Sequence, residues 1–463
     1  MIYYNTIQSN KEFSIPMKNL TKGNPLKLIL LFALPLFIGQ IFQLFYGLVD
    51  TRIVGETLGE TSLAAVGSTT AVSDLMIHFM NGLTNGFAII VATFFGAEDE
   101  KALKKSAAGT LLLGLLTAIV LTILATIFLY PILGFLNTPE TILVEASSYI
   151  HIIILGLAAS ALYNACASIL RAVGDSVTPL IFLILSSFLN IFLDYAFIKG
   201  FHFGVEGAAL ATVISQIISM ILCLIYMVVK YPVLRLKPED FRISPALLSR
   251  LIKTGLSMAF MVSFVSFGTL ALQTSINTFG NDIIVAHSAA RKATSIFMLP
   301  FGVFGTTLAT YCGQNLGAGK PSRIKKGILN TILLTWAWCA VILIIVYTCA
   351  PLLIHLITTT TNPEILDTAT LYLRVNSLLY FVPAVICLLR NGMQGIGDHI
   401  TPVFSSIIEL VGKVLAAMFF APAVGYWGII LSEPIVWCIM VIPLLIKTIH
   451  NPLFRQTDSP GIE

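Results

Sequence analysis

The sequence predicts an all-α integral membrane protein with twelve transmembrane helices in two six-helix bundles. Of its 463 residues, 57% are hydrophobic and only 11% are charged, whereas soluble domains contain about 25% charged residues. The mean hydropathy is +0.90, and the apolar segments are long and unbroken, unlike the alternating segments of a membrane β-barrel. This composition excludes a soluble enzyme, a nucleic-acid-binding protein and a disordered chain, and it makes the lipid bilayer the expected surroundings.

Twelve apolar segments follow one another along the chain, each long enough to cross a bilayer, which takes about 20 residues. Charged residues, proline or glycine separate them. Those of the first half lie at 28–51, 65–95, 106–136, 142–170, 178–199 and 206–231. Those of the second half lie at 248–277, 283–316, 325–357, 366–394, 401–422 and 425–448. The seven cysteines fall within these segments without a CxxC motif, so neither a disulfide framework nor a metal site is expected.

Basic residues alternate between the two sides of the predicted membrane. Most of the 27 lysines and arginines lie in the N-terminal tail, in every second loop and after the last segment. Arg171 and Arg390 are counted among those of the loops. The opposite loops hold few, among them Arg52. The positive-inside rule then predicts a multi-pass protein of the plasma membrane with both termini cytoplasmic. The predicted organisation is a tail over 1–27, a bundle over 28–231, a linker over 232–247, a second bundle over 248–448 and a tail over 449–463.

The two halves of the chain resemble each other at a nearly constant offset. LRAVGDSVTPL at 170–180 recurs as MQGIGDHITPV at 393–403. GVEGAAL at 204–210 recurs as GYWGIIL at 425–431. FFGAEDEKALKKS at 94–106 recurs as NLGAGKPSRIKKG at 315–327, with the same offset as the second match. Three matches in the same order indicate an internal duplication.

Each repeat contains an even number of segments, so both enter the bilayer with the same polarity. The two bundles should therefore be related by a pseudo-two-fold axis along the membrane normal, and should face each other across a central cavity. This architecture favours an alternating-access transporter. An enzyme is not expected, because the chain carries neither an HExxH motif nor a Walker A motif.

Seven fragments follow one another along the chain: ALPLFIGQIFQLFYGLVDTRIVG, FFGAED, RAVGDSVTP, NIFLDYAFI, GAALAT, GQNLGAG and QGIGDHITP. This ordered set resembles the multidrug and toxic compound extrusion (MATE) family over about 25–448, most closely its bacterial DinF-like or MepA-like branch. The resemblance implies a secondary active multidrug exporter that exchanges Na⁺ or H⁺ for cationic and amphipathic compounds. It implies no other cofactor.

Polar residues within the first bundle predict a cation site. Asp50 shares one helical face with Gln40 and Gln43, Asn190 and Asp194 share another, and Thr212 lies on a third. Two carboxylates, an amide oxygen and a hydroxyl suit a small hard cation, Na⁺ or H⁺. The resemblance implies the same site, since the family's cation ligands match Asp50, Asn190, Asp194 and Thr212. The alternative is a hydrogen-bonded packing cluster.

The second bundle departs from this pattern. By the repeat offsets, Asn190 corresponds to Lys413 and Thr212 to Glu433. We expect the Lys413 ammonium to occupy the place of a bound cation, held by Glu433, with Glu409 one helical turn away. The alternative is a buried ion-pair cluster without a role in coupling. In either case, the second bundle is not expected to bind a cation.

A further set of polar residues is expected to line the central cavity and to meet organic cations. They are Gln43, Asp74, His78, Asn81, Gln273 and Asn277. Arg291 and Lys292 are expected near a helix end, with their charges extended toward water. No obligate protein partner is indicated, and a monomer is expected. The alternative function is a flippase or an exporter of one metabolite or lipid-linked cargo, against which the acidic character of the first bundle argues.

Overall fold

The computed structural model describes residues 19–136 and 138–455, and it is helical throughout apart from short connections. Ten helices in these ranges are long and apolar enough to cross a membrane, and two bent helix pairs complete a set of twelve. The predicted all-helical fold is confirmed. The lysines expected in the extreme N-terminal tail, and the tail after Arg455, lie outside the described residues.

The first bundle is built from eight α-helices and one π-helical segment, and each predicted segment has its helix. Polar caps set several starts: Asn24 accepts hydrogen bonds from the backbone of Leu26 and Lys27, and Asp99 accepts one from Ala102. The elements are α1 (Pro25–Leu58), α2 (Glu60–Gly96), α3 (Glu100–Ile127), α4 (Leu129–Phe135), α5 (Glu140–Leu155), α6 (Leu157–Ala172), α7 (Val177–Asp194), the π-helical Tyr195–Gly200 and α8 (Val205–Lys230).

The second bundle repeats this order after two short 3₁₀ turns, Pro232–Leu234 and Pro238–Phe241. A second π-helical segment, Ala416–Phe420, occupies the position equivalent to the first. The elements are α9 (Pro245–Ile276), α10 (Asn281–Gly317), α11 (Pro321–Thr358), α12 (Pro363–Ser377), α13 (Phe381–Gly395), α14 (Ile400–Leu415), the π-helical segment, α15 (Ala421–Val424) and α16 (Tyr426–His450), with a final 3₁₀ turn at Pro452–Arg455.

The structure differs from the predicted segments mainly at helix ends and bends. Arg52 lies inside α1 rather than in a loop, because Arg52 and Glu56 form an exposed i,i+4 ion pair of 2.6 Å that lets the helix continue. The predicted segment 106–136 breaks at Phe128 into α3 and α4. The fourth and tenth segments bend by 44° between α5 and α6 and by 57° between α12 and α13.

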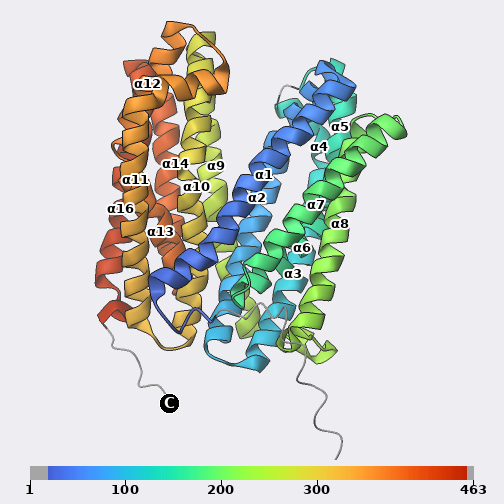
Figure 1. Cartoon of the computed structure of the whole chain (residues 1–463), viewed down its shortest axis with the longest axis vertical. Helices are drawn as coiled ribbons and strands as arrows, with labels where there is room; N and C mark the ends of the chain where they lie inside the picture. The colour runs from blue at the N-terminus through green and yellow to red at the C-terminus, as the bar shows by residue number, and fades with distance from the viewer. Residues whose placement is uncertain (1–18, 137, 456–463) are drawn as a thin grey trace, which may run out of the picture.

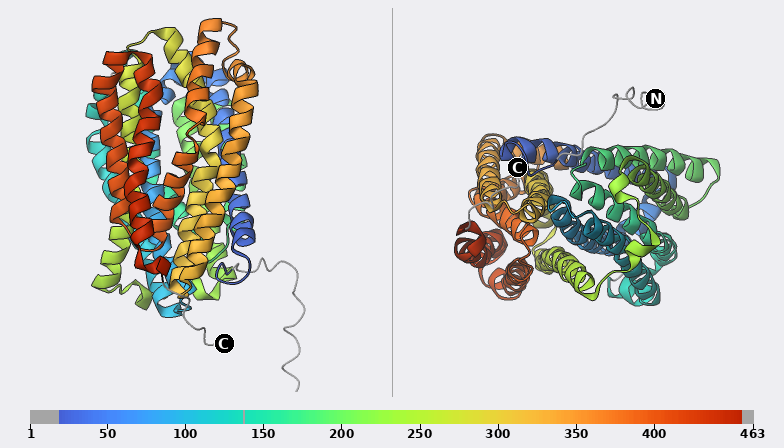
Figure 2. Two further views of the ribbon diagram at one scale, coloured as in Figure 1. Left: turned by 90° about the vertical axis from the view of Figure 1, so that its left-hand side faces the viewer. Right: turned by 90° about the horizontal axis from the view of Figure 1, so that it is seen from below.

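The two bundles stand side by side, touch at one end and diverge toward the other (Figure 1). The touching end, which we call the closed end, also holds the start of α1 and the end of α16 (Figures 1 and 2). There α2 packs against α9 so closely that a Cβ on Gly86 would lie 2.6 Å from the Thr254 carbonyl oxygen. Gly96 likewise faces the Gln314 carbonyl, and Gly317 faces the Thr93 carbonyl. Only glycine permits so close an approach of two helix backbones.

Two helices cross from one bundle to the other at the closed end. α1 packs on α10 and α11 of the second bundle and on α7 of the first. Its residues Leu30 to Phe37 face the second bundle, and Gly39 already faces Leu180 and Leu183 of α7. The equivalent helix α9 packs on α2 of the first bundle and on α14 of the second. An apolar groove of about 380 Å³ lies between Leu34 and Phe37 of α1 and Phe304 and Trp338 of the second bundle. Pro35 lies in this part of α1.

The residues before α1 are packed rather than free. Leu20 is fully buried, and its backbone N–H donates to Gln314 Oε1 at 2.9 Å. The same Gln314 side chain donates to the carbonyl of Ala172 in the first bundle at 2.8 Å. Arg323 donates to the carbonyls of Leu20 and Gly23. The segment predicted as a tail over 1–27 thus joins the two bundles from residue 19 onward.

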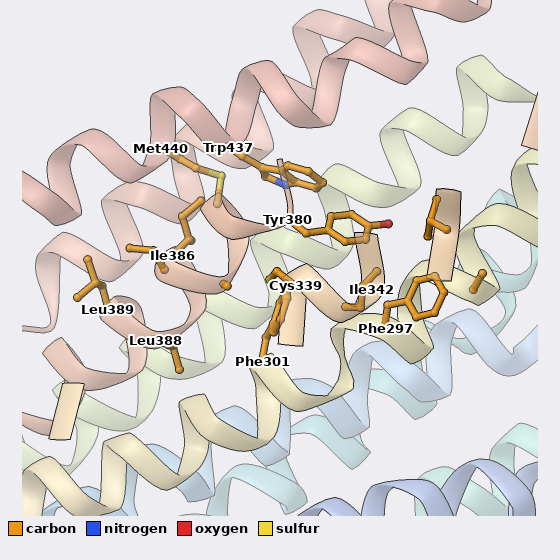
Figure 3. Close-up of a cluster of buried hydrophobic side chains, with 14 of the residues drawn as sticks. Phe297, Phe301, Cys339, Ile342, Tyr380, Ile386, Leu388, Leu389, Trp437 and Met440 are labelled. Carbon is orange, nitrogen blue, oxygen red and sulfur yellow. The ribbon is translucent and has the colours of Figure 1, made fainter. Parts of the chain in front are cut away.

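The largest buried apolar cluster is formed mainly by the second bundle, and Leu20, Ile29 and Phe32 from the start of the chain join it (Figure 3). Tyr380 stands at its centre, with its ring 6.1 Å from that of Trp437 and its hydroxyl 2.9 Å from Thr294 Oγ1. This core is close-packed, and the polar groups of its aromatic side chains, such as the Tyr380 hydroxyl, find partners within it.

Candidate functional site

The structure brings together the four residues predicted to form the cation site of the first bundle. Asp50 comes from α1, Asn190 and Asp194 from α7, and Thr212 from α8. Asp194 and Asn190 are buried, and the Asp50 and Asp194 carboxyls lie close enough to interact with each other. With its amide oriented to satisfy its neighbours, Asn190 donates to Asp194 Oδ2 at 3.1 Å, and its oxygen accepts from Thr212 Oγ1 at 3.2 Å.

Two oxygens at this site have no partner. Asp50 Oδ1 and Asp194 Oδ1 are buried, and neither accepts a hydrogen bond from any described residue. Two carboxyl groups can share a contact only if a proton or a metal ion lies between them, because two bare carboxylates repel. The arrangement therefore offers oxygen ligands to one small cation. Within the described residues there is no cluster of three or more His, Cys, Asp or Glu side chains suited to a metal ion.

Two tyrosines complete the walls of this site, and sequence reasoning missed both. The amide of Asn190 donates to Tyr46 Oη at 2.9 Å, and Tyr149 of α5 lies close enough to interact electrostatically with Asp50 and Asp194. The repeat offset that relates 170–180 to 393–403 also relates Tyr149 to Tyr372, so the duplication held a signal for this position. The π-helical segment begins directly after Asp194, and such segments are frequent at functional sites.

The second bundle holds a chain of five charges that alternate in sign. The predicted residues Glu409, Lys413 and Glu433 do come together: Lys413 Nζ lies 3.0 Å from Glu409 Oε1 and 3.5 Å from Glu433 Oε1. Arginines extend the chain at both ends. Arg390 Nη1 donates to Glu409 Oε2 at 3.0 Å, and Arg291 Nη1 donates to both oxygens of Glu433, at 2.7 and 3.0 Å.

Three predictions for arginine are therefore wrong. Arg390 is buried beside Glu409 rather than in a charged loop, and Arg291 pairs with Glu433 instead of extending toward water. Arg171 is half-buried and donates to Asn85 Oδ1 at 3.1 Å. The sequence held one signal for the first two, since Lys413 alone could not balance two buried carboxylates, and buried charges are paired.

The same two positions touch in both bundles although their residue types differ. Asn190 lies 3.2 Å from Thr212, and their equivalents Lys413 and Glu433 lie 3.5 Å apart. The cation nearer to Glu433 is Arg291, at 2.7 Å, rather than the expected Lys413, at 3.5 Å. The same pair of positions thus forms a neutral polar contact beside Asp50 and Asp194 in the first bundle and an ion pair in the second.

The residues predicted to line a cavity lie on the halves of α1, α2 and α9 beyond the tightly packed closed end. Gln43, Asp74, His78 and Asn277 are exposed, and Asn81 and Gln273 are half-buried. Gln273 donates to Asn277 Oδ1 at 2.9 Å. Asp74 and His78 lie one helical turn apart on α2, and no ion pair joins them among the described salt bridges.

Comparison with known proteins agrees with this architecture. The MatE family model matches the chain twice, over residues 35–196 and 257–419, one match to each bundle. A probable multidrug resistance protein of Bacillus subtilis, YoeA, is 28% identical over 396 residues, which cover 84% of this chain and 85% of that protein. The multidrug export protein MepA of Staphylococcus aureus is 23% identical over 95% of this chain and 97% of its own.

Two further similarities bear on function and fold. An FAD transporter of Shewanella oneidensis is 23% identical over 88% of this chain and 91% of its own. The solved structure of an outward-facing MATE family transporter superposes with a TM-score of 0.87 at 24% identity, and covers 96% of this chain and all of that one. With two matched repeats, one in each bundle, the chain belongs to the MatE family, the multidrug and toxic compound extrusion transporters.

Proposed function

We propose that this protein is a secondary active exporter that exchanges Na⁺ or H⁺ for cationic and amphipathic organic compounds. The observation that carries the proposal is the pair of adjacent carboxyl groups, Asp50 and Asp194, each with one buried oxygen that lacks a partner. A cation bound there would be held by Asp50, Asp194, Asn190 and Thr212, all of them oxygen ligands. The relatives named as multidrug proteins support the cargo class.

Binding would act through the packing of α1, α7 and α8, which carry the four site residues. The empty site holds two like charges in a poor dielectric, and a proton or Na⁺ removes their repulsion. Because the carboxyls come from α1 and α7, the occupied site favours a tighter packing of these helices. The first half of α1 lies on the second bundle, so α1 would pass this change on. A ligand shifts such an equilibrium only by its differential affinity for the two states.

The route of the cargo would lie between the bundles. With both termini cytoplasmic, as the basic loops indicate, the closed end faces the cytoplasm and the structure corresponds to an outward-open state. An organic cation would there meet Asp74 and His78 of α2, the polar Gln43 and Asn81, and the Gln273–Asn277 pair of α9. We place the protein in the plasma membrane as a monomer.

Asp194→Asn is expected to abolish gradient-driven transport. In proteoliposomes that contain the purified full chain, an imposed Na⁺ or pH gradient should drive ethidium export by the wild type, and the active gradient identifies the ion. The asparagine removes the charge that holds the cation, so transport should fall to the level of protein-free liposomes. Glu56→Gln is the matched control, because this acid of α1 forms only an exposed ion pair, and it should transport normally.

Gradient-driven export that survives in Asp194→Asn would contradict the site. The second candidate function, export of a single metabolite, is favoured by the similarity to the FAD transporter. If no organic cation is transported by the wild type under either gradient, this candidate replaces the first.

A further inference from the structure

The charge chain of the second bundle is not balanced. Its members are Arg390, Glu409, Lys413, Glu433 and Arg291, and consecutive members lie 2.7 to 3.5 Å apart. Three are cations and two are anions, so one positive charge is in excess. A net charge inside a membrane protein is costly unless water or an opposite charge meets it. The chain therefore calls for an anion at one of its ends.

Only one end is accessible. The side chains of Arg390 and Lys413 are 7% and 3% exposed, whereas that of Arg291 is 30% exposed. The hydrogen bonds from Arg291 to Glu433 use Nη1, and the Tyr372 hydroxyl also lies beside this guanidinium. Arg390 Nη2 is buried without a partner among the described residues, so Arg291 is the end of the charge chain that an anion from outside can reach.

A small cavity lies against this arginine. It measures about 20 Å³, and a cavity of about 10–15 Å³ already holds one water. Polar side chains of Arg291, Gln273, Thr269 and His287 line it. The Thr269 hydroxyl donates to the Val265 carbonyl, and the Gln273 amide donates one hydrogen bond to Asn277 and keeps a second N–H. Glu433 also lines the cavity, but its oxygens are engaged by Arg291 and by the Tyr372 hydroxyl, which donates at 2.7 Å.

We propose that this cavity binds one anionic group against Arg291, either a free halide or the carboxylate of a transported compound. Its position is equivalent to that of the cation site, since Thr212 corresponds to Glu433 and Tyr149 to Tyr372. The two bundles thus offer equivalent sites of opposite charge, acidic in the first and basic in the second. A compound that carries both a cationic and an anionic group matches this pair.

Chloride binding to the purified full chain in detergent, with gluconate as the only other anion, tests the site without any gradient. Saturable binding of radioactive chloride is expected. Gln273→Leu removes a lining donor and leaves the ion pairs intact, so it should weaken binding roughly tenfold or more. Lys292→Gln is the matched control, because it removes an exposed cation next to Arg291 that does not line the cavity, and its affinity should be unchanged.

A rhodamine methyl ester and its free acid distinguish the two sources of the anion. Displacement of chloride by the acid but not by the ester identifies the carboxylate of a carried compound. Saturable chloride binding that neither dye displaces identifies a halide site. Absence of saturable chloride binding, together with equal affinity for acid and ester, would overturn the proposal, as would equal chloride affinity in wild type and a folded Gln273→Leu. Since these are equilibrium measurements, loss of coupled transport would not affect them.

Discussion

Replacing Glu433 by glutamine is expected to lower the free energy of unfolding by about 3–5 kcal/mol. Glu433 is buried, and it holds Arg291 at 2.7 Å, the Tyr372 hydroxyl at 2.7 Å and Lys413 at 3.5 Å. Without its charge, three cations remain against the single carboxylate of Glu409. The change is measured by thermal unfolding of the purified protein in detergent, followed by tryptophan fluorescence and by the recovery of monodisperse protein.

Lys413→Met is the matched control for this result. It removes the middle charge but leaves two neutral pairs, Arg390 with Glu409 and Arg291 with Glu433, and a methionine fills much of the space of the lysine stem. The loss of stability should be clearly smaller than in Glu433→Gln. If Lys413→Met is the more damaging substitution, Lys413 rather than Arg291 is the main partner of the carboxylate.

Gly317→Ala is expected to open the closed end. Its Cβ would run into the carbonyl of Thr93, and no flexible side chain is available to move away. A contact between two backbones can be relieved only if α2 and α10 separate, so states in which the bundles part at this end gain population. Gly302→Ala on the same helix is the control, because nothing lies within 4 Å of its new Cβ.

Alkylation of a reporter cysteine measures this opening. Ala92 is fully buried in the contact of α2 with α10, and Ala92→Cys can be placed in a chain whose accessible Cys349, Cys387 and Cys438 are serine. N-ethylmaleimide should label the reporter about tenfold faster or more in Gly317→Ala, which corresponds to about 1.4 kcal/mol. Equal labelling in Gly317→Ala and Gly302→Ala would show that the contact does not hold the closed end together.

The number and order of the helices were predictable because each crossing needs its own apolar run, which hydropathy reads directly. The bends were not. Nothing in the hydropathy of 142–170 marks the 44° bend between α5 and α6, since hydropathy reports the length of apolar chain and not its direction. The continuation of α1 past Arg52 was also not predictable from hydropathy. The charged residues Arg52 and Glu56 lower the hydropathy and suggest a helix end, but they form an i,i+4 ion pair that lets the helix continue.

The meeting of Asp50, Asn190, Asp194 and Thr212 was predictable from helical periodicity and from the family resemblance. The meeting of Lys413 with Glu433 was predictable from the duplication. Which cation pairs with which carboxylate was not, because Arg291 and Arg390 come from helices whose mutual rotation only the folded structure fixes. The position of an arginine near a helix end does not tell whether its side chain faces water or a buried carboxylate.

The packing of α1 and α9 on the opposite bundles determines at which positions two related transporters could be joined in a chimaera. The first half of α1 is covalently part of the first bundle but packs on α10 and α11 of the second, and α9 does the reverse on α2. A chimaera joined at the linker near Pro238 would therefore combine two foreign interfaces, the groove around Phe37 and the glycine contact at Gly86. A chimaera that keeps these contacts would take residues 19–37 from the parent that supplies the second bundle, and the start of α9 from the parent that supplies the first. The segments that must be exchanged together are therefore not consecutive in the sequence.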